Sequence, residues 1–190
     1  MDTMRRAQTV LGDDFISVED IMSAGLGVYT LAQVKQLAMT IPSRKVLEEL
    51  KRNDYGLVPQ PTSKDFLKLI SLREIEYVAL PGGQWLAIKK TPVLGSGFHT
   101  WCEQLQLLKG GERVPTILEA AWFLLAFRTV RRQQLFTYLL RTSTQDVSAA
   151  PHSLGSRHFA VRELRGSETL FSVEDGYAGT GVGLSAAWKL

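Results

Sequence analysis

Cysteine is nearly absent from this chain, since Cys102 is the only one among its 190 residues. No disulfide can therefore form within the chain, which is compatible with a reducing compartment. Long apolar runs are absent as well: the longest, residues 117–127, is interrupted by Glu119 and is shorter than the roughly 18–20 residues that span a bilayer. The basic residues Arg5 and Arg6 are not followed by an apolar stretch. We therefore expect neither a transmembrane segment nor a secretory signal.

Metal-binding residues are also scarce. Three histidines and one cysteine form no zinc-binding pattern in the sequence. Glu174 and Asp175, together with backbone oxygens, offer a conceivable calcium site, but an acidic turn explains the same pair and is the interpretation we prefer. The sequence therefore predicts neither a metal nor another cofactor.

Motifs for catalysis are not found either. Dinucleotide binding requires a glycine run that follows a strand and opens a long helix. Neither the run at residues 25–27 nor the run at 179–183 meets this requirement. Residues 183–187 lack the last glycine of a nucleophile elbow. His99 precedes Cys102 by three residues, so a thiol–imidazole pair is conceivable. A helix-packing cysteine beside a loop histidine is the interpretation we favour, and we expect a protein that is not an enzyme.

Positive charge exceeds negative charge only slightly. The net charge is +3, and the sequence isoelectric point is near 9.1. The densest basic group, Arg128, Arg131 and Arg132, follows an expected helix, where cations complement the helix dipole. A nucleic-acid-binding patch is the alternative. We do not expect nucleic acid as the partner, but an accessory protein that binds it remains the second hypothesis.

What is present is the composition of a soluble globular protein, with 45% hydrophobic and 22% charged residues. Residues 1 to about 14 show no period and predict a loose tail. Ser17, Thr30, Ser43 and Ser63 each precede a short helical pattern as N-caps. In the second of these helices the expected apolar stripe is formed by Leu31, Val34, Ala38 and Ile41. Residues 1–75 are thus expected to form a helical N-terminal extension, with an extended stretch at 58–61.

The pattern changes after residue 75. Residues 77–80 and 84–88 flank a glycine turn and predict a β-hairpin. Thr100 caps a helix with Trp101, Leu105 and Leu108 on one face. A second helix is expected with Pro115 at its first position, running through about Arg128. It is apolar on most sides, so its Glu119 must lie near an edge or be paired. Strands are expected at 135–142, 157–164, 169–174 and 182–189, which gives an α+β fold.

Two segments carry a resemblance to a known fold. Arg113-Val114-Pro115-Thr116 followed by Glu119 resembles the Arg-Leu-Pro-Thr-x-x-Glu helix start of the formylglycine-generating-enzyme branch of C-type-lectin-like proteins. The ending Val182-Gly183-Leu184-Ser185 resembles the closing strand of that branch. Ala120 stands where that helix usually has Trp, and Leu184-Ser185 replaces Phe-Arg. The order of hairpin, two helices and antiparallel strands over residues 76–190 is similar to the C-type-lectin-like core.

The resemblance extends to microbial and phage-borne proteins, some of which are variable proteins of diversity-generating retroelements. It implies a non-enzymatic binding protein, cytoplasmic or phage-associated, whose last strands and loops carry hypervariable side chains and contact a protein or surface ligand. Formylglycine-generating enzymes work through cysteines, and Cys102 alone does not reproduce their site. Residues 1–75 carry no resemblance to a known family.

Candidate ligand-binding residues lie on the last long strands and the loop that follows them. Tyrosine among Gly and Thr at 177–180 is typical of binding loops, although a structural turn explains the same residues. Which side of the strand at 169–174 faces the core stays open at this stage. We take the outward residues to be His158, Ala160, Arg162, Phe171, Val173, Asp175, Tyr177 and Thr180. This interpretation depends on the terminal segment pairing with residues near Trp85, so that the scaffold is stiff.

Overall fold

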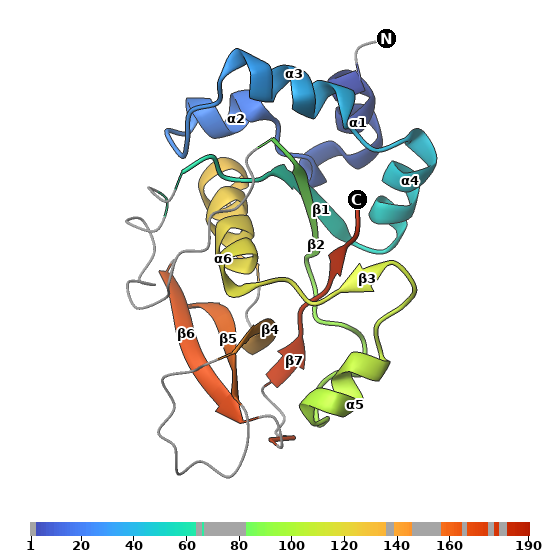
Figure 1. Cartoon of the computed structure of the whole chain (residues 1–190), viewed down its shortest axis with the longest axis vertical. Helices are drawn as coiled ribbons and strands as arrows, with labels where there is room; N and C mark the ends of the chain where they lie inside the picture. Colours follow the sequence, from blue (N-terminus) through green and yellow to red (C-terminus); the bar gives the residue numbers. More distant parts are fainter. Residues whose placement is uncertain are drawn as a thin grey trace.

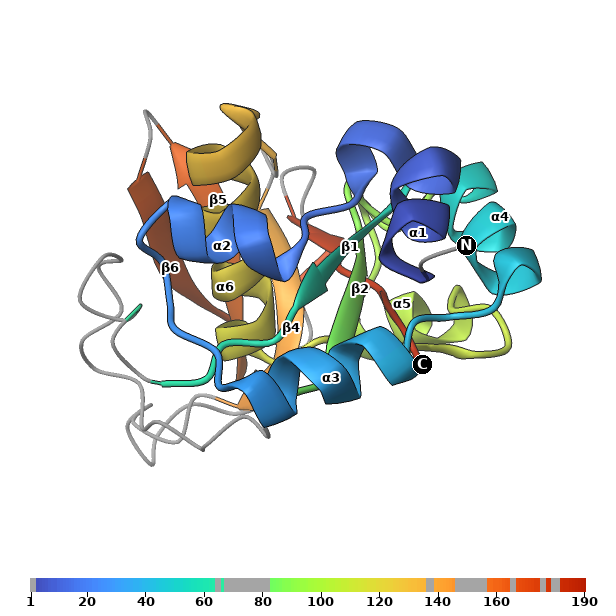
Figure 2. The ribbon, with the colours of Figure 1, turned by 90° about the horizontal axis from the view of Figure 1, so that it is seen from above.

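The computed structural model describes residues 3–63, 66, 83–135, 139–145, 157–164, 167–174, 177–178 and 182–190. Within these ranges the chain has a mixed α+β fold with two four-stranded sheets (Figure 1). The N-terminal helices lie at one end of the molecule, and the second sheet lies at the other end. Helix α6 (Ile117–Ala126) lies between the two sheets and contacts strands of both, as the view from above shows (Figure 2).

Four α-helices and one 3-10 turn form the N-terminal layer within the described residues. They are α1 (Thr3–Leu11), η1 (Gly12–Asp14), α2 (Val18–Ser23), α3 (Leu31–Met39) and α4 (Arg44–Arg52). The side chains of Ser17, Thr30 and Ser43 accept a hydrogen bond from the backbone N–H three residues on. Each thereby satisfies one of the free N–H groups at a helix start. Three of the four caps predicted in this region are confirmed, and the helix expected after Ser63 falls largely outside the described residues.

Two details of this layer differ from the sequence-based expectations. Residues 3–11 form a helix instead of a loose tail, because Ala7 and Leu11 are buried against the core. In α3 the fully buried residue is Leu37, whereas Leu31 is 70% exposed. Val34 and Ile41 of the predicted stripe do pack in the core, so the prediction was wrong for Leu31 and missed Leu37. The indole Nε1 of Trp85 donates to the Leu37 carbonyl at 2.9 Å and fixes α3 on the first sheet.

The first sheet has the strand order β1-β2-β8-β3. Its strands are β1 (Tyr55–Pro59), β2 (Trp85–Lys89), β3 (Glu112–Arg113) and β8 (Ala187–Trp188). The first arm of the predicted hairpin, residues 77–80, lies outside the described residues. Among the described residues β2 pairs antiparallel with β1 on one side and β8 on the other.

Residues assigned to the N-terminal extension therefore share a sheet with residues assigned to the C-terminal part. The predicted division at 75/76 itself lies outside the described residues. A single cluster of buried side chains extends from Ala7 on α1 to Ala187 on β8. The helical layer is thus packed on the core of the molecule and is not separate from it.

The chain end pairs as expected. Ala87 is opposite Trp188 and Ile88 is opposite Ala187, and the Lys89 N–H donates to the Ala186 carbonyl at 2.9 Å. β8 is therefore a central strand, held by β2 on one side and β3 on the other. The predicted return of the terminal segment to the neighbourhood of Trp85 is confirmed.

The second sheet has the order β6-β5-β4-β7. Its strands are β4 (Leu139–Gln145), β5 (Arg157–Leu164), β6 (Ser167–Glu174) and β7 (Val182–Leu184). The expected single strand at 182–189 is in fact two strands, because the chain passes from the second sheet to the first at Ser185 and Ala186. β7 runs parallel to β4, so the expectation of purely antiparallel strands was wrong for this pair.

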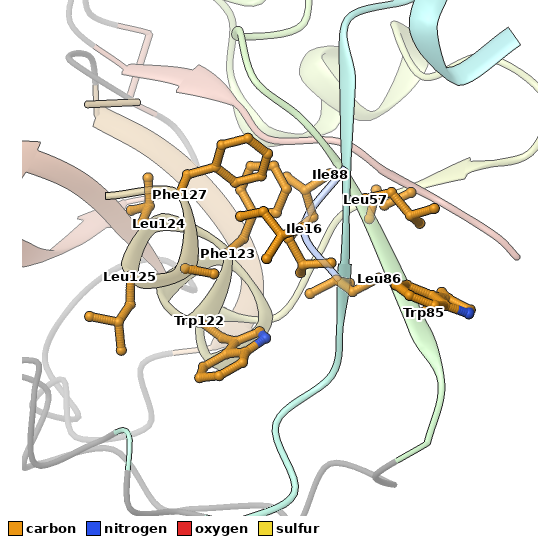
Figure 3. Packing of buried hydrophobic residues seen from close by; sticks show 14 of the residues in the cluster. Ile16, Leu57, Trp85, Leu86, Ile88, Trp122, Phe123, Leu124, Leu125 and Phe127 are labelled. Carbon is orange, nitrogen blue, oxygen red and sulfur yellow. The ribbon is translucent and has the colours of Figure 1, made fainter. Parts of the chain in front are cut away.

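Every residue of α6 is buried, as its apolar composition predicts. Figure 3 shows the rings of Phe123 and Phe127 directed toward the strands that carry Leu57 and Ile88. The indole of Trp122 donates to the Pro59 carbonyl at 2.8 Å. The π-helical turn η3 (Phe127–Arg131) extends α6. This helix therefore joins the β1–β2 layer to the second sheet.

Glu119 is paired, as its burial requires. Its two carboxylate oxygens accept from the Arg113 guanidinium at 2.6 and 2.8 Å, and it completes a capping box with Thr116. The bonds from Glu119 raise the pKa of Arg113 above its ordinary value, although partial burial opposes this. The motif at 113–119 thus ties β3 to the start of α6. Within the described ranges, the helices lack the length and apolar character that crossing a membrane demands.

Gly56 provides a direct test of the contact between β1 and α6. A Cβ at this position would lie 2.5 Å from Cζ of Phe127 and 2.8 Å from Cζ of Phe123. We expect Gly56→Ala to lower the free energy of unfolding by about 1–3 kcal/mol, because overpacking displaces both rings. Denaturant unfolding measures this change.

Gly110→Ala is the matched control, because a Cβ at Gly110 meets no atom within 4 Å. Its unfolding midpoint should stay close to that of the wild type. Since alanine is otherwise preferred to glycine in a strand, a Gly56→Ala protein as stable as the wild type would contradict the described packing.

Candidate functional site

The register of β5 and β6 brings most of the predicted strand residues together. His158 pairs with Val173, Ala160 with Phe171, and Arg162 with Thr169. Residues opposite one another in an antiparallel pair are close neighbours. The five predicted residues of these strands therefore form one contiguous group on the β5–β6 hairpin. Asp175 and Thr180 lie outside the described residues.

The expected outward orientation is wrong for two of the predicted residues. Ala160 is fully buried, and His158 is 5% exposed. The His158 imidazole stacks on the Trp101 ring with a centroid distance of 4.0 Å and an interplanar angle of 21°. Ala160 belongs to a small apolar cluster with Val182. These two residues support the sheet from within and do not face solvent.

Tyr177, by contrast, is accessible to a ligand. Its side chain is about half exposed, with a relative exposure of 51%. The carbonyl oxygen of the same residue accepts a hydrogen bond from the Arg141 guanidinium at 2.6 Å. An aromatic side chain thus points to solvent while its own backbone is fixed to a buried group.

Arg141 on β4 is the centre of a buried polar junction. It is completely buried, and among the described residues its guanidinium donates to the carbonyls of His99 and Tyr177 and to Oε1 of Gln104, the last at 3.0 Å. Gln104 is buried as well, although the sequence predicted an apolar inner face for its helix α5 (Trp101–Gln106). Arg141 therefore connects β4 with α5, the preceding loop and the chain that follows β6.

The loop at residues 93–99 is fastened by further bonds. The Leu184 N–H donates to the Ser96 hydroxyl at 2.9 Å, and the Val93 N–H donates to the Leu184 carbonyl at 3.0 Å. The Gln104 side-chain amide donates to the Ser96 carbonyl at 2.7 Å. Ser96 is 1% exposed. The middle of the loop is therefore held between β7 and α5.

Two apolar side chains nevertheless project from this loop. Leu94 is 94% exposed and Phe98 is 67% exposed. Phe98 also has a φ of 65°, in the left-handed region that disfavours residues with a Cβ. A strained residue persists only where its surroundings hold it, and such residues gather at functional sites. We refer to Leu94, Phe98 and Tyr177 as the projecting residues.

The side chains that the sequence offered for catalysis or metal binding do not form a site of either kind within the described residues. Cys102 is exposed and does not pack a helix, contrary to the favoured interpretation. Nδ1 of His99 lies 3.8 Å from the Glu103 carboxylate. Hydrogen bonds from the Thr100 backbone N–H and hydroxyl lower the pKa of Glu103 below its ordinary value. Among the residues that the structure describes, no three His, Cys, Asp or Glu side chains gather as a metal ion would require.

Sequence reasoning did not identify Arg141, Leu94 or Phe98. An arginine within the apolar start of a strand, as in Leu139-Leu140-Arg141, is a signal for a buried polar junction, because a charge there needs partners. Phe98 follows Gly95-Ser96-Gly97, which indicates a loop but does not indicate that the aromatic side chain is exposed. Comparison of the whole chain with known proteins adds nothing to this geometry, since no family model, curated protein or solved structure matches it significantly.

Arg141→Met tests whether the guanidinium fixes the chain at Tyr177. The substitution leaves the buried Oε1 of Gln104 without this donor, at a cost of about 1–3 kcal/mol, and releases the carbonyls of His99 and Tyr177. We expect lower global stability. Under native conditions, chymotrypsin cleavage should accelerate relative to the wild type more after Tyr177 than after the buried Trp122, as measured by mass spectrometry. Equal acceleration at both sites would show global unfolding alone and would contradict a local role.

Arg44→Met is the control for this experiment. Arg44 pairs with Glu48 on the surface of α4, and its side chain is 75% exposed. Exposed pairs of this kind contribute little to stability. The cleavage pattern of this variant should therefore match that of the wild type.

Proposed function

We propose that this chain is a non-enzymatic binding protein, which presents side chains from its C-terminal strands and loops on a C-type-lectin-like scaffold. The proposed type is the variable protein of a diversity-generating retroelement. One observation carries the proposal: Tyr177 projects into solvent while its carbonyl is held at 2.6 Å by the buried Arg141. A rigid aromatic side chain on a fixed backbone contributes contact area with little loss of conformational entropy on binding.

The path of the terminal segment supports the scaffold part of this proposal. β6 ends at Glu174 and β7 begins at Val182, so the predicted ligand residues 175–180 are enclosed in sequence by two strands of one sheet. The same segment then joins the first sheet through β8. Both sheets therefore anchor the part of the chain that carries the proposed binding loop.

The set of proposed contacts is narrower than the sequence suggested. Buried His158 and Ala160 are not included, because a ligand cannot reach them in this arrangement. The proposal retains Tyr177 because this residue is exposed. It retains five further residues on sequence grounds: Arg162, Phe171, Val173, Asp175 and Thr180.

The nucleic-acid alternative receives less support. Arg131, one of the three basic residues behind it, donates to the carbonyls of Asp13 and Phe15, and its guanidinium lies 3.3 Å from the Asp20 carboxylate. It therefore fixes η3 to the N-terminal layer. Titration of the protein with duplex and single-stranded DNA at rising salt separates the two functions, since phosphate-driven binding weakens steeply with salt.

Sequencing this gene from several isolates tests the proposed function. We expect substitutions to be concentrated at the codons of the proposed contact residues, and at adenines within them. The codons of Arg141, Gln104 and Ser96 are the internal control, because changes there would disrupt the buried junction. Substitutions spread evenly along the gene would contradict a diversified binding protein.

A further inference from the structure

We propose that Gln104 on α5 is a positioning residue, which holds both ends of the segment at residues 177–182. This role rests on the proposed function, because the segment contains Tyr177 and Thr180 of the candidate binding loop. Gln104 is remote in sequence from the last strands, and its effect is measured through local opening of the segment, without a ligand.

The C-terminal end of the segment is bonded to Gln104 directly. The side-chain Nε2 of Gln104 donates to the Val182 carbonyl at 3.2 Å, where the chain enters β7. The same Nε2 donates to the Ser96 carbonyl at 2.7 Å. A side-chain amide has two such donors, and here both hold neighbouring backbone. The start of β7 and the loop before α5 are therefore fixed to one side chain.

The N-terminal end of the segment is bonded to Gln104 through Arg141. Oε1 of Gln104 accepts from Nη1 of Arg141 at 3.0 Å, and Nη2 of the same guanidinium donates to the Tyr177 carbonyl at 2.6 Å. The donors of a guanidinium have a fixed planar geometry. An acceptor that orients Nη1 therefore also orients Nη2 toward Tyr177.

Only one orientation of the Gln104 amide satisfies these bonds. Reversal would place Oε1 against two carbonyl oxygens and the NH2 group against the guanidinium, and neither arrangement forms a hydrogen bond. Gln104 and Arg141 are both completely buried, so bulk water does not replace a lost partner and an unsatisfied group is costly. The position therefore requires a side chain that both donates and accepts.

Two substitutions at this position separate the two ends of the segment. Gln104→Met removes the donors and the acceptor, whereas Gln104→Glu keeps an acceptor for Arg141 and removes the donors. We expect Gln104→Met to accelerate chymotrypsin cleavage after Tyr177 by about tenfold relative to cleavage after Trp122, because local opening exposes the segment. Gln104→Glu should leave this cleavage near the wild-type rate.

Hydrogen exchange reports on the other end. The Leu184 amide donates to the Ser96 hydroxyl at 2.9 Å. Both substitutions release the Ser96 carbonyl, so both should speed exchange at the Leu184 amide relative to the amides of α6. Gln60→Met is the matched control, because Gln60 is 5% exposed but its Oε1 accepts no hydrogen bond. This variant should not change cleavage after Tyr177 relative to its global stability.

A double substitution tests the route through Arg141. In the Arg141→Met protein, the difference between Gln104→Glu and Gln104→Met at Tyr177 should disappear. Persistence of that difference would overturn the assigned role. Equal acceleration by the two single variants would overturn it as well, and so would acceleration at Tyr177 no greater than at Trp122.

If Gln104→Met does not fold, Gln104→Glu decides alone. Exchange at the Leu184 amide must then rise while cleavage after Tyr177 stays near the wild-type rate, and any other pattern contradicts the role of Gln104. Failure of this test leaves the proposed function to the sequencing of isolates. An evenly substituted gene, conversely, removes the proposed function and leaves the effect of Gln104 on the segment intact.

Discussion

The return of the chain end to β2 is the constraint on which the rest of the structure depends. β8 lies between β2 and β3, and the Lys89 N–H bonds to the Ala186 carbonyl at 2.9 Å. Only a few residues earlier, β7 pairs with β4 in the other sheet. One short segment thus fastens two sheets that α6 separates. The position of β7 in turn fixes Ser96 and the loop that carries Phe98, so the influence of the terminal pairing extends to this loop.

Arg141 links this framework to the exposed residue Tyr177. A buried arginine is costly unless its donors are satisfied, and here backbone carbonyls from two separate segments accept from it. These bonds hold the backbone at His99 and the backbone at Tyr177 in a common arrangement. A polar group therefore holds the backbone at Tyr177 from beneath, while most of the buried hydrophobic residues of the described ranges belong to the apolar cluster around α6.

Much of the fold could be predicted because it is encoded locally. Ser17, Thr30 and Ser43 mark helix starts through side-chain bonds made within three residues, and the apolar composition of α6 predicts its burial. The errors arose where distant contacts decide. Leu37 is buried on a helix that Trp85 fixes through a bond to the Leu37 carbonyl, and His158 is buried where Trp101 stacks on it. The projecting residues Leu94 and Phe98 could not be predicted either, since their exposure depends on β7 and α5 holding Ser96.

Native-state hydrogen exchange at the Lys89 amide tests the central claim most directly, because this proton is bonded to the Ala186 carbonyl in the terminal segment. If β8 is a central strand of the first sheet, this amide should exchange only through global unfolding, with the same free energy as the most protected amides of α6. Exchange at a rate typical of a fraying chain end would contradict the account, because the two sheets would then lack their common anchor.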